Sequence, residues 1–124
     1  MYSQHTLYYI ALSMLDGIGP VLAKQLISYI GSAEQIFKEP LKQLEKIPNI
    51  GPVLANEIYH NKVLKKAELE LQYAEKNNIK ILQFNETDYP QRLKNCEDSP
   101  LLFYYKGNVN FNSQKIICIV GTRN

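Results

Sequence analysis

The hexapeptide Ile18-Gly19-Pro20-Val21-Leu22-Ala23 occurs twice in this chain, because residues 50–55 repeat it letter for letter. An exact repeat of this length in 124 residues indicates that the first half is built from two copies of one structural unit. Glycine suits a tight turn, and proline suits the first position of a helix, where its missing N–H costs nothing. Each copy therefore predicts a turn leading into a helix, with Gly19 and Gly51 in the turns.

The residues before the two copies also correspond. Gly17 precedes the first copy by one residue, and Asn49 takes the same place before the second. Asparagine is the residue that, after glycine, best tolerates left-handed backbone. This pattern resembles the helix-hairpin-helix motif, here as a SAM-like tandem over about residues 7–63. The resemblance implies recognition of the nucleic acid backbone without base readout, and unpaired N–H groups at a helix start do favour a phosphate there.

Two departures from the motif bear on DNA binding. Hairpins of this kind that grip DNA usually carry Lys or Arg two residues after the last glycine, whereas this chain has Val21 and Val53. Residues 1–63 hold five Lys and five Asp or Glu, so this half is electrically neutral. Both features indicate hairpins that act mainly as packing modules. The weak candidates for DNA contact within them are Gly17, Gly19, Gly51 and Lys24.

Apolar spacing divides the chain near residue 78. Over residues 1–78, apolar side chains recur three and four apart, which predicts an α-helical domain. After Pro52 no helix breaker occurs before Asn77, so the sequence permits a helix of up to ~25 residues. Its second half carries an apolar seam that should dock on a neighbour, formed by Leu64, Ala67, Leu71 and Ala74.

Residues 79–124 have the texture of strands. Segments 80–84 and 102–105 are expected strands, and 115–120 is continuously apolar after Lys115, which is typical of a central parallel strand buried on both faces. A buried strand that runs into Gly121 is how a doubly wound fold opens its ligand site. The prediction is a truncated start of an α/β Rossmann-like domain. We expect the chain to be a piece of a longer protein, because no crossover helix follows.

The order of features resembles the bacterial DNA-processing protein A family (DprA/Smf). The tandem hairpins are followed by Tyr89-Pro90-x-x-Leu93, by residues 100–107 (Pro-Leu-Leu-Phe-Tyr-Tyr-Lys-Gly) and by residues 119–124 (Ile-Val-Gly-Thr-Arg-Asn). The resemblance implies a helical domain joined to an extended Rossmann domain. It also implies a protein that protects incoming single-stranded DNA and loads the RecA recombinase onto it in natural transformation.

The same resemblance assigns a DNA-binding loop. Gly121, Thr122 and Arg123 match the family's Gly-Ser/Thr-Arg sequence, which holds a phosphate of single-stranded DNA. The chemistry is suitable, since glycine allows close approach, threonine donates a hydrogen bond and arginine forms a charged fork. The implied partners are single-stranded DNA, RecA and a second copy of the protein, the last two through parts beyond residue 124.

Several other classes of site lack their signatures. Cys96 and Cys118 stand alone, which indicates reduced thiols in a cytoplasmic protein, and no metal or cofactor motif is present. The acidic residues show no catalytic pairing, and there is no Walker loop, so we expect a protein that is not an enzyme. The N-terminus lacks a signal peptide, and no apolar run is long enough for a membrane span.

Two alternatives come from other functional classes. In the first, the hairpins belong to a DNA repair enzyme, such as a resolvase or an excision-nuclease subunit, which predicts basic turns and a carboxylate cluster. In the second, the Gly121 loop opens a nucleotide-binding Rossmann enzyme, which predicts a GxGxxG run. The sequence shows none of these signals.

Overall fold

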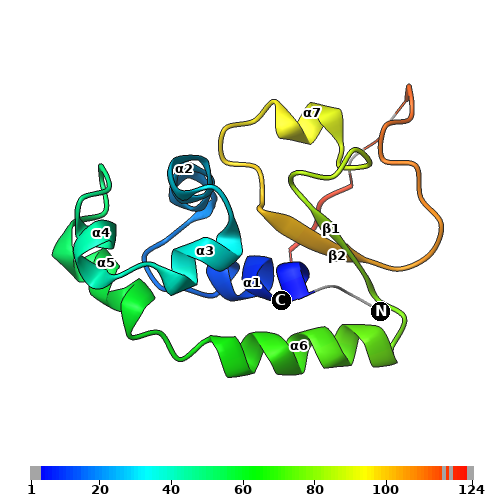
Figure 1. The fold of residues 1–124 in the computed structure, drawn as a ribbon. Helices are drawn as coiled ribbons and strands as arrows, with labels where there is room; N and C mark the ends of the chain where they lie inside the picture. The colour runs from blue at the N-terminus through cyan, green and yellow to red at the C-terminus, as the bar shows by residue number, and fades with distance from the viewer. Residues whose placement is uncertain (1–3, 116, 118, 123–124) are drawn as a thin grey trace.

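The computed structural model describes residues 4–115, 117 and 119–122. Its elements form a helical part, a two-stranded sheet and one further short helix (Figure 1). In chain order they are α1 (Gln4–Ser13), α2 (Pro20–Ile30), α3 (Ala33–Lys38), α4 (Leu41–Glu45), α5 (Gly51–Tyr59), α6 (Leu64–Lys76), β1 (Lys80–Gln83), α7 (Gln91–Lys94) and β2 (Leu102–Tyr105).

Helix α1 lies at the centre of the fold. It packs against α6, α3, α2 and β2, and Figure 1 shows it between the cluster of α2 to α5 and the sheet, with α6 running beneath. Its residues Ile10, Ala11 and Leu12 have no exposed surface. The helix buries several faces because it is apolar almost all round, with polar residues confined mainly to its ends.

The two hairpin turns confirm the backbone expected from the repeat. Gly17 has φ 79° and Asn49 has φ 69°, so asparagine does replace glycine in a left-handed position. The identical hexapeptides nevertheless differ in backbone. Gly51 has φ 67°, whereas Gly19 is the extended N-cap of α2 with φ −86°, a value open to any residue.

The single long helix that the sequence permits after Pro52 does not form. Helix α5 ends at Tyr59, and α6 begins at Leu64. The side chain of Asn61 competes with the helical hydrogen bonds, since its Nδ2 donates to the Ile58 carbonyl at 2.8 Å and its Oδ1 accepts from the Val63 N–H at 3.3 Å. The expected seam of α6 is confirmed: Ala67 and Ala74 are buried, and Leu64 and Leu71 pack at the edge of the core.

The start of a Rossmann-like sheet is not confirmed. β1 and β2 do form, but they pair with each other in antiparallel register, Lys80 opposite Tyr105 and Gln83 opposite Leu102. The expected parallel strand at residues 115–120 is absent from the described residues there, and Ile117 and Ile119 are 89% and 94% exposed. An apolar strand needs neighbours on both sides and cover on both faces, which the two short strands of the described sheet do not supply.

The sheet and the helices share one hydrophobic core. Ile81, Leu101 and Leu102 belong to the same buried cluster as the side chains of α1. A buried hydrogen bond from Gln83 Nε2 to Thr6 Oγ1, 2.7 Å long, also joins β1 to α1. Residue 78 therefore marks a change in sequence pattern, and the parts before and after it are in contact.

Within the described residues, no helix combines the length and the apolar character needed to cross a membrane.

Alanine substitutions at Gly17 and Gly19 test whether only Gly17 needs the left-handed backbone. Gly17→Ala places a Cβ at φ 79°, which costs about 1–2 kcal/mol of folding free energy. That Cβ also lies 2.9 Å from Leu54 Cδ2, but the end of a leucine side chain can shift. Gly19→Ala is the matched control, since φ is negative and nothing lies within 4 Å of the added Cβ. Urea denaturation should show a loss for Gly17→Ala only; equal losses would contradict the turn assignment.

Candidate nucleic-acid interface

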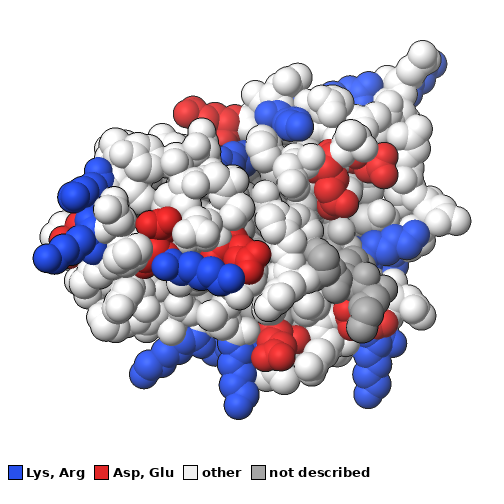
Figure 2. Space-filling model, in the orientation of Figure 1, with Lys and Arg blue, Asp and Glu red and all other residues white. Residues whose placement is uncertain are grey.

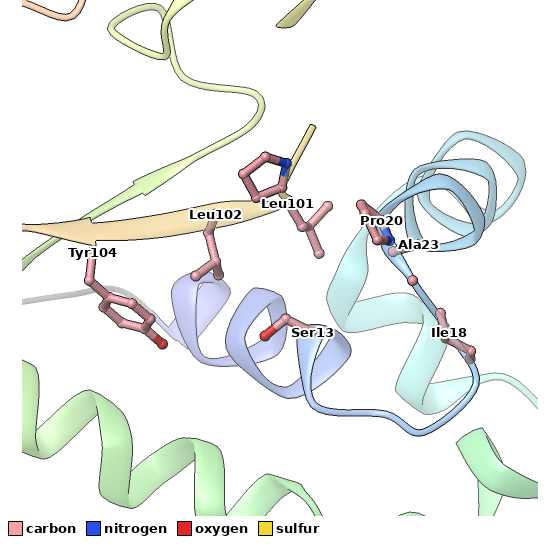
Figure 3. A pocket seen from close by; sticks show the side chains of 9 residues that line it. Ser13, Ile18, Pro20, Ala23, Leu101, Leu102 and Tyr104 are labelled. Carbon is pink, nitrogen blue, oxygen red and sulfur yellow. The ribbon is translucent and has the colours of Figure 1, made fainter. Parts of the chain in front are cut away.

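The first hairpin turn, residues 16–20, faces the start of β2. A cleft of about 280 Å³ lies between them, and Figure 3 shows side chains from both sides directed into it. Ile18, Gly19 and Pro20 line one wall, and residues 100–102 with Tyr104 line the other. The lining is mostly apolar, so the arrangement serves packing between the hairpin and the sheet better than it serves a phosphate chain.

Lys24, a candidate from the first hairpin, is engaged within the protein. Its Nζ donates to Ser99 Oγ at 2.7 Å and to the Glu97 carbonyl at 3.2 Å, and it lies 4.3 Å from the centre of the Phe84 ring. Desolvation lowers the pKa of this ammonium group, and the nearby Asp98 carboxylate opposes that shift. Lys24 thus fastens α2 to the loop before β2.

The second hairpin turn, residues 48–52, is more open. Pro48, Asn49 and Pro52 are exposed, and Val53 on the first turn of α5 is 80% exposed. Val53 is therefore not a packing residue, contrary to the expectation from sequence, whereas Val21 is half-buried. The position two residues after Gly51 points to solvent, so an apolar side chain there contributes little to the core.

The expected phosphate loop is only partly described. Gly121 and Thr122 are exposed and lie outside helices and strands, while Arg123 falls outside the described residues. The structure does not bring Gly121 and Thr122 together with Gly17, Gly19, Gly51 or Lys24 through any contact it shows among the described residues.

Charge is dispersed over the face of the molecule that Figure 2 presents. Figure 2 shows Lys and Arg interspersed with Asp and Glu on the face it presents, without a continuous basic patch. This matches a net charge of only +2 for the chain. Among the described residues, no three His, Cys, Asp or Glu side chains are grouped so as to hold a metal ion.

Two features were missed at the level of sequence. The contact of Lys24 with Ser99 joins residues far apart in the chain, and no local spacing signals it. Tyr29 is 63% exposed on α2 beside two clefts. A signal for Tyr29 did exist, because it falls outside the apolar stripe of its helix, formed by Leu22, Leu26, Ile27 and Ile30.

Comparisons with known proteins divide the chain in the same way. Residues 9–61 match the model of the SAM-like helix-hairpin-helix tandem. Residues 80–124 match the model of DNA recombination-mediator protein A. No solved structure matches the chain.

Individual relatives match either the hairpins alone or nearly the whole chain. UvrABC system protein C is 32% identical over 50 residues in Yersinia pseudotuberculosis serotype I (strain IP32953) and in Serratia proteamaculans (strain 568), covering 40% of this chain and 8% of each relative. Protein Smf of Synechocystis sp. is 26% identical over 120 residues, covering 94% of this chain and 30% of the relative. The chain thus spans less than a third of the length of these relatives.

The alignment with protein Smf runs through both matched segments, in the order expected from the motifs. The chain therefore resembles the DNA-processing protein A (DprA/Smf) family over residues 80–124 and tandem helix-hairpin-helix motifs over residues 9–61, and it is similar to protein Smf over nearly its whole length.

Proposed function

We propose that this chain is part of a single-stranded DNA-binding protein that protects incoming DNA and loads the RecA recombinase in natural transformation. The observation that carries the proposal is the match to DNA recombination-mediator protein A, which includes Gly121, Thr122 and Arg123. The alignment with protein Smf over 94% of the chain supports it further. The protein acts as a homodimer without a cofactor and without an enzymatic activity of its own.

The proposed DNA contact is made by residues 121–123. Gly121 and Thr122 are exposed, so a phosphate can approach the backbone and the hydroxyl group. Arg123 supplies the charge-assisted hydrogen bonds. Contacts to phosphate carry no sequence preference, which suits a protein that accepts any incoming strand.

The helical part is proposed to support this site rather than to grip DNA phosphates through its hairpin turns. The first hairpin turn faces β2, and Lys24 is hydrogen-bonded to Ser99. In the second hairpin, Val53 stands where a hairpin that grips DNA carries a cation. A hairpin module of a repair nuclease subunit is the second candidate, favoured by the UvrABC system protein C matches. Two facts count against this candidate: those matches cover only 50 residues, and the hairpin turns in the described part of the chain lack basic residues.

Arg123→Ala in the full-length protein should weaken binding of single-stranded DNA. Loss of one charged hydrogen-bonding contact costs about 1.5–3 kcal/mol. The loss should be the same for unrelated sequences, and the slope of log K against log salt should become shallower by about 0.7. Salt titrations on two unrelated oligonucleotides measure both quantities. Arg92→Ala, which removes the same charge from α7, is the control; an unchanged affinity and slope for Arg123→Ala would refute the site.

Lys24→Met should lower stability and leave DNA affinity unchanged. The substitution removes the bonds to Ser99 and Glu97, which costs about 1–2 kcal/mol because Ser99 is buried. Lys38→Met is the matched control, since Lys38 forms an exposed ion pair with Glu34 that contributes little. Thermal melting and oligonucleotide titration are measured together. A weaker affinity and a shallower salt slope for Lys24→Met would make Lys24 a phosphate ligand instead.

A further inference from the structure

The side of the helical part next to the second hairpin turn carries a groove that the proposed DNA site does not use. It consists of two adjoining clefts of about 360 and 210 Å³ that share Tyr29 and Ile47. Tyr29 is 63% exposed, whereas Ile47 is buried and belongs to the core. We call this surface the Tyr29 groove.

The walls of the groove combine polar side chains with apolar surface. Gln25, Ser28 and Asn49 line the larger cleft, and Gln43 and Glu39 line the smaller one together with Ile30. Pro48 completes the larger cleft. The groove therefore combines an exposed aromatic ring with side-chain amides and a hydroxyl group, each of which can both donate and accept hydrogen bonds.

We propose that the Tyr29 groove binds an unpaired base of single-stranded DNA, stacked on the Tyr29 ring; this rests on the proposed function. Every base has a π-face, so stacking on tyrosine holds a strand without sequence preference. Amides of glutamine and asparagine can turn to present a donor or an acceptor to whichever base edge arrives.

The charges around the groove are compatible with a strand that enters and leaves it. Lys42 and Lys46 are exposed and flank Gln43 and Ile47 in the chain. Figure 2 shows basic side chains at the end of the molecule where Figure 1 places α4 and α5. Of the neighbouring acids, Glu39 Oε1 accepts a hydrogen bond from Gln35 Nε2 at 3.0 Å, and Glu45 is exposed on α4.

The chemistry of the lining favours a base over a protein segment. A groove for an amphipathic helix or an apolar peptide presents mainly aliphatic side chains. Here the exposed residues of the larger cleft are Gln25, Ser28, Tyr29, Pro48 and Asn49, with the aliphatic Ile47 only 5% exposed.

The test compares Tyr29 with an equally exposed tyrosine. Tyr73 on α6 is also 63% exposed, but it lies beside Glu70 and away from the groove. In the full-length protein, Tyr29→Ala should weaken binding of a dT20 oligonucleotide by about tenfold or more, while Tyr73→Ala leaves it unchanged. The salt slope should stay the same for Tyr29→Ala, because no phosphate contact is removed. Tyr29→Phe should restore the affinity, since it keeps the ring.

Two further measurements separate stacking from indirect effects. An abasic phosphodiester chain of the same length should bind wild type and Tyr29→Ala equally, because it offers no base to stack. A dT20 oligonucleotide carrying 5-iodouracil should photocrosslink to the peptide that contains Tyr29. The inference is overturned if wild type binds dT20 without forming that crosslink and Tyr29→Ala binds dT20 equally well. The groove would then serve another ligand, such as a peptide. If wild type fails to bind dT20 at all, the proposed function fails instead.

Discussion

The burial of α1 is the constraint on which the rest of the structure depends. This one helix contacts α2, α3, α6 and β2, and three consecutive residues in it have no exposed surface. Burial of each large aliphatic side chain stabilises the fold by roughly 1.5–3 kcal/mol. Because Thr6 on the same helix also bonds Gln83, the position of β1 is set by α1 as well. The hairpins and the sheet are therefore held in one arrangement around a common centre.

Because the hairpins and the sheet share this core, the two hairpins have different roles. In the first hairpin, both the turn and the cation Lys24 are directed at the β2 side, where Ser99 and Phe84 receive the ammonium group. The second hairpin is left open to solvent, and its turn forms one wall of the Tyr29 groove. Two copies of the same hexapeptide thus serve different ends, the first attaching the helices to the sheet and the second leaving a surface available.

Local features of the fold were predictable from sequence, and long-range ones were not. The left-handed Asn49 and the two short strands followed from residue type and local pattern, which act over a few residues. The end of α5 was missed because Asn61 breaks the helix through side-chain bonds, without a proline or glycine. Residues 115–120 were expected to form a buried strand because they are apolar. Apolar content alone, however, does not say which strands will flank such a segment. Of the candidate site, Gly121 and Thr122 could be named from motif resemblance, whereas the partners of Lys24 and the groove around Tyr29 required the fold.

The exposure of Ile117, Ile119 and Val120 affects how the protein can be handled. Residues 116–120 read Ile-Ile-Cys-Ile-Val, without a charge, a proline or a glycine, and the side chains described there are almost fully exposed. Short segments of high β-propensity and low charge, once exposed, are templates for pairing with the same segment of another molecule. A polypeptide of residues 1–124 should therefore lose solubility as its concentration rises, and a charged residue in place of Ile117 should counter this self-association without touching the helical core.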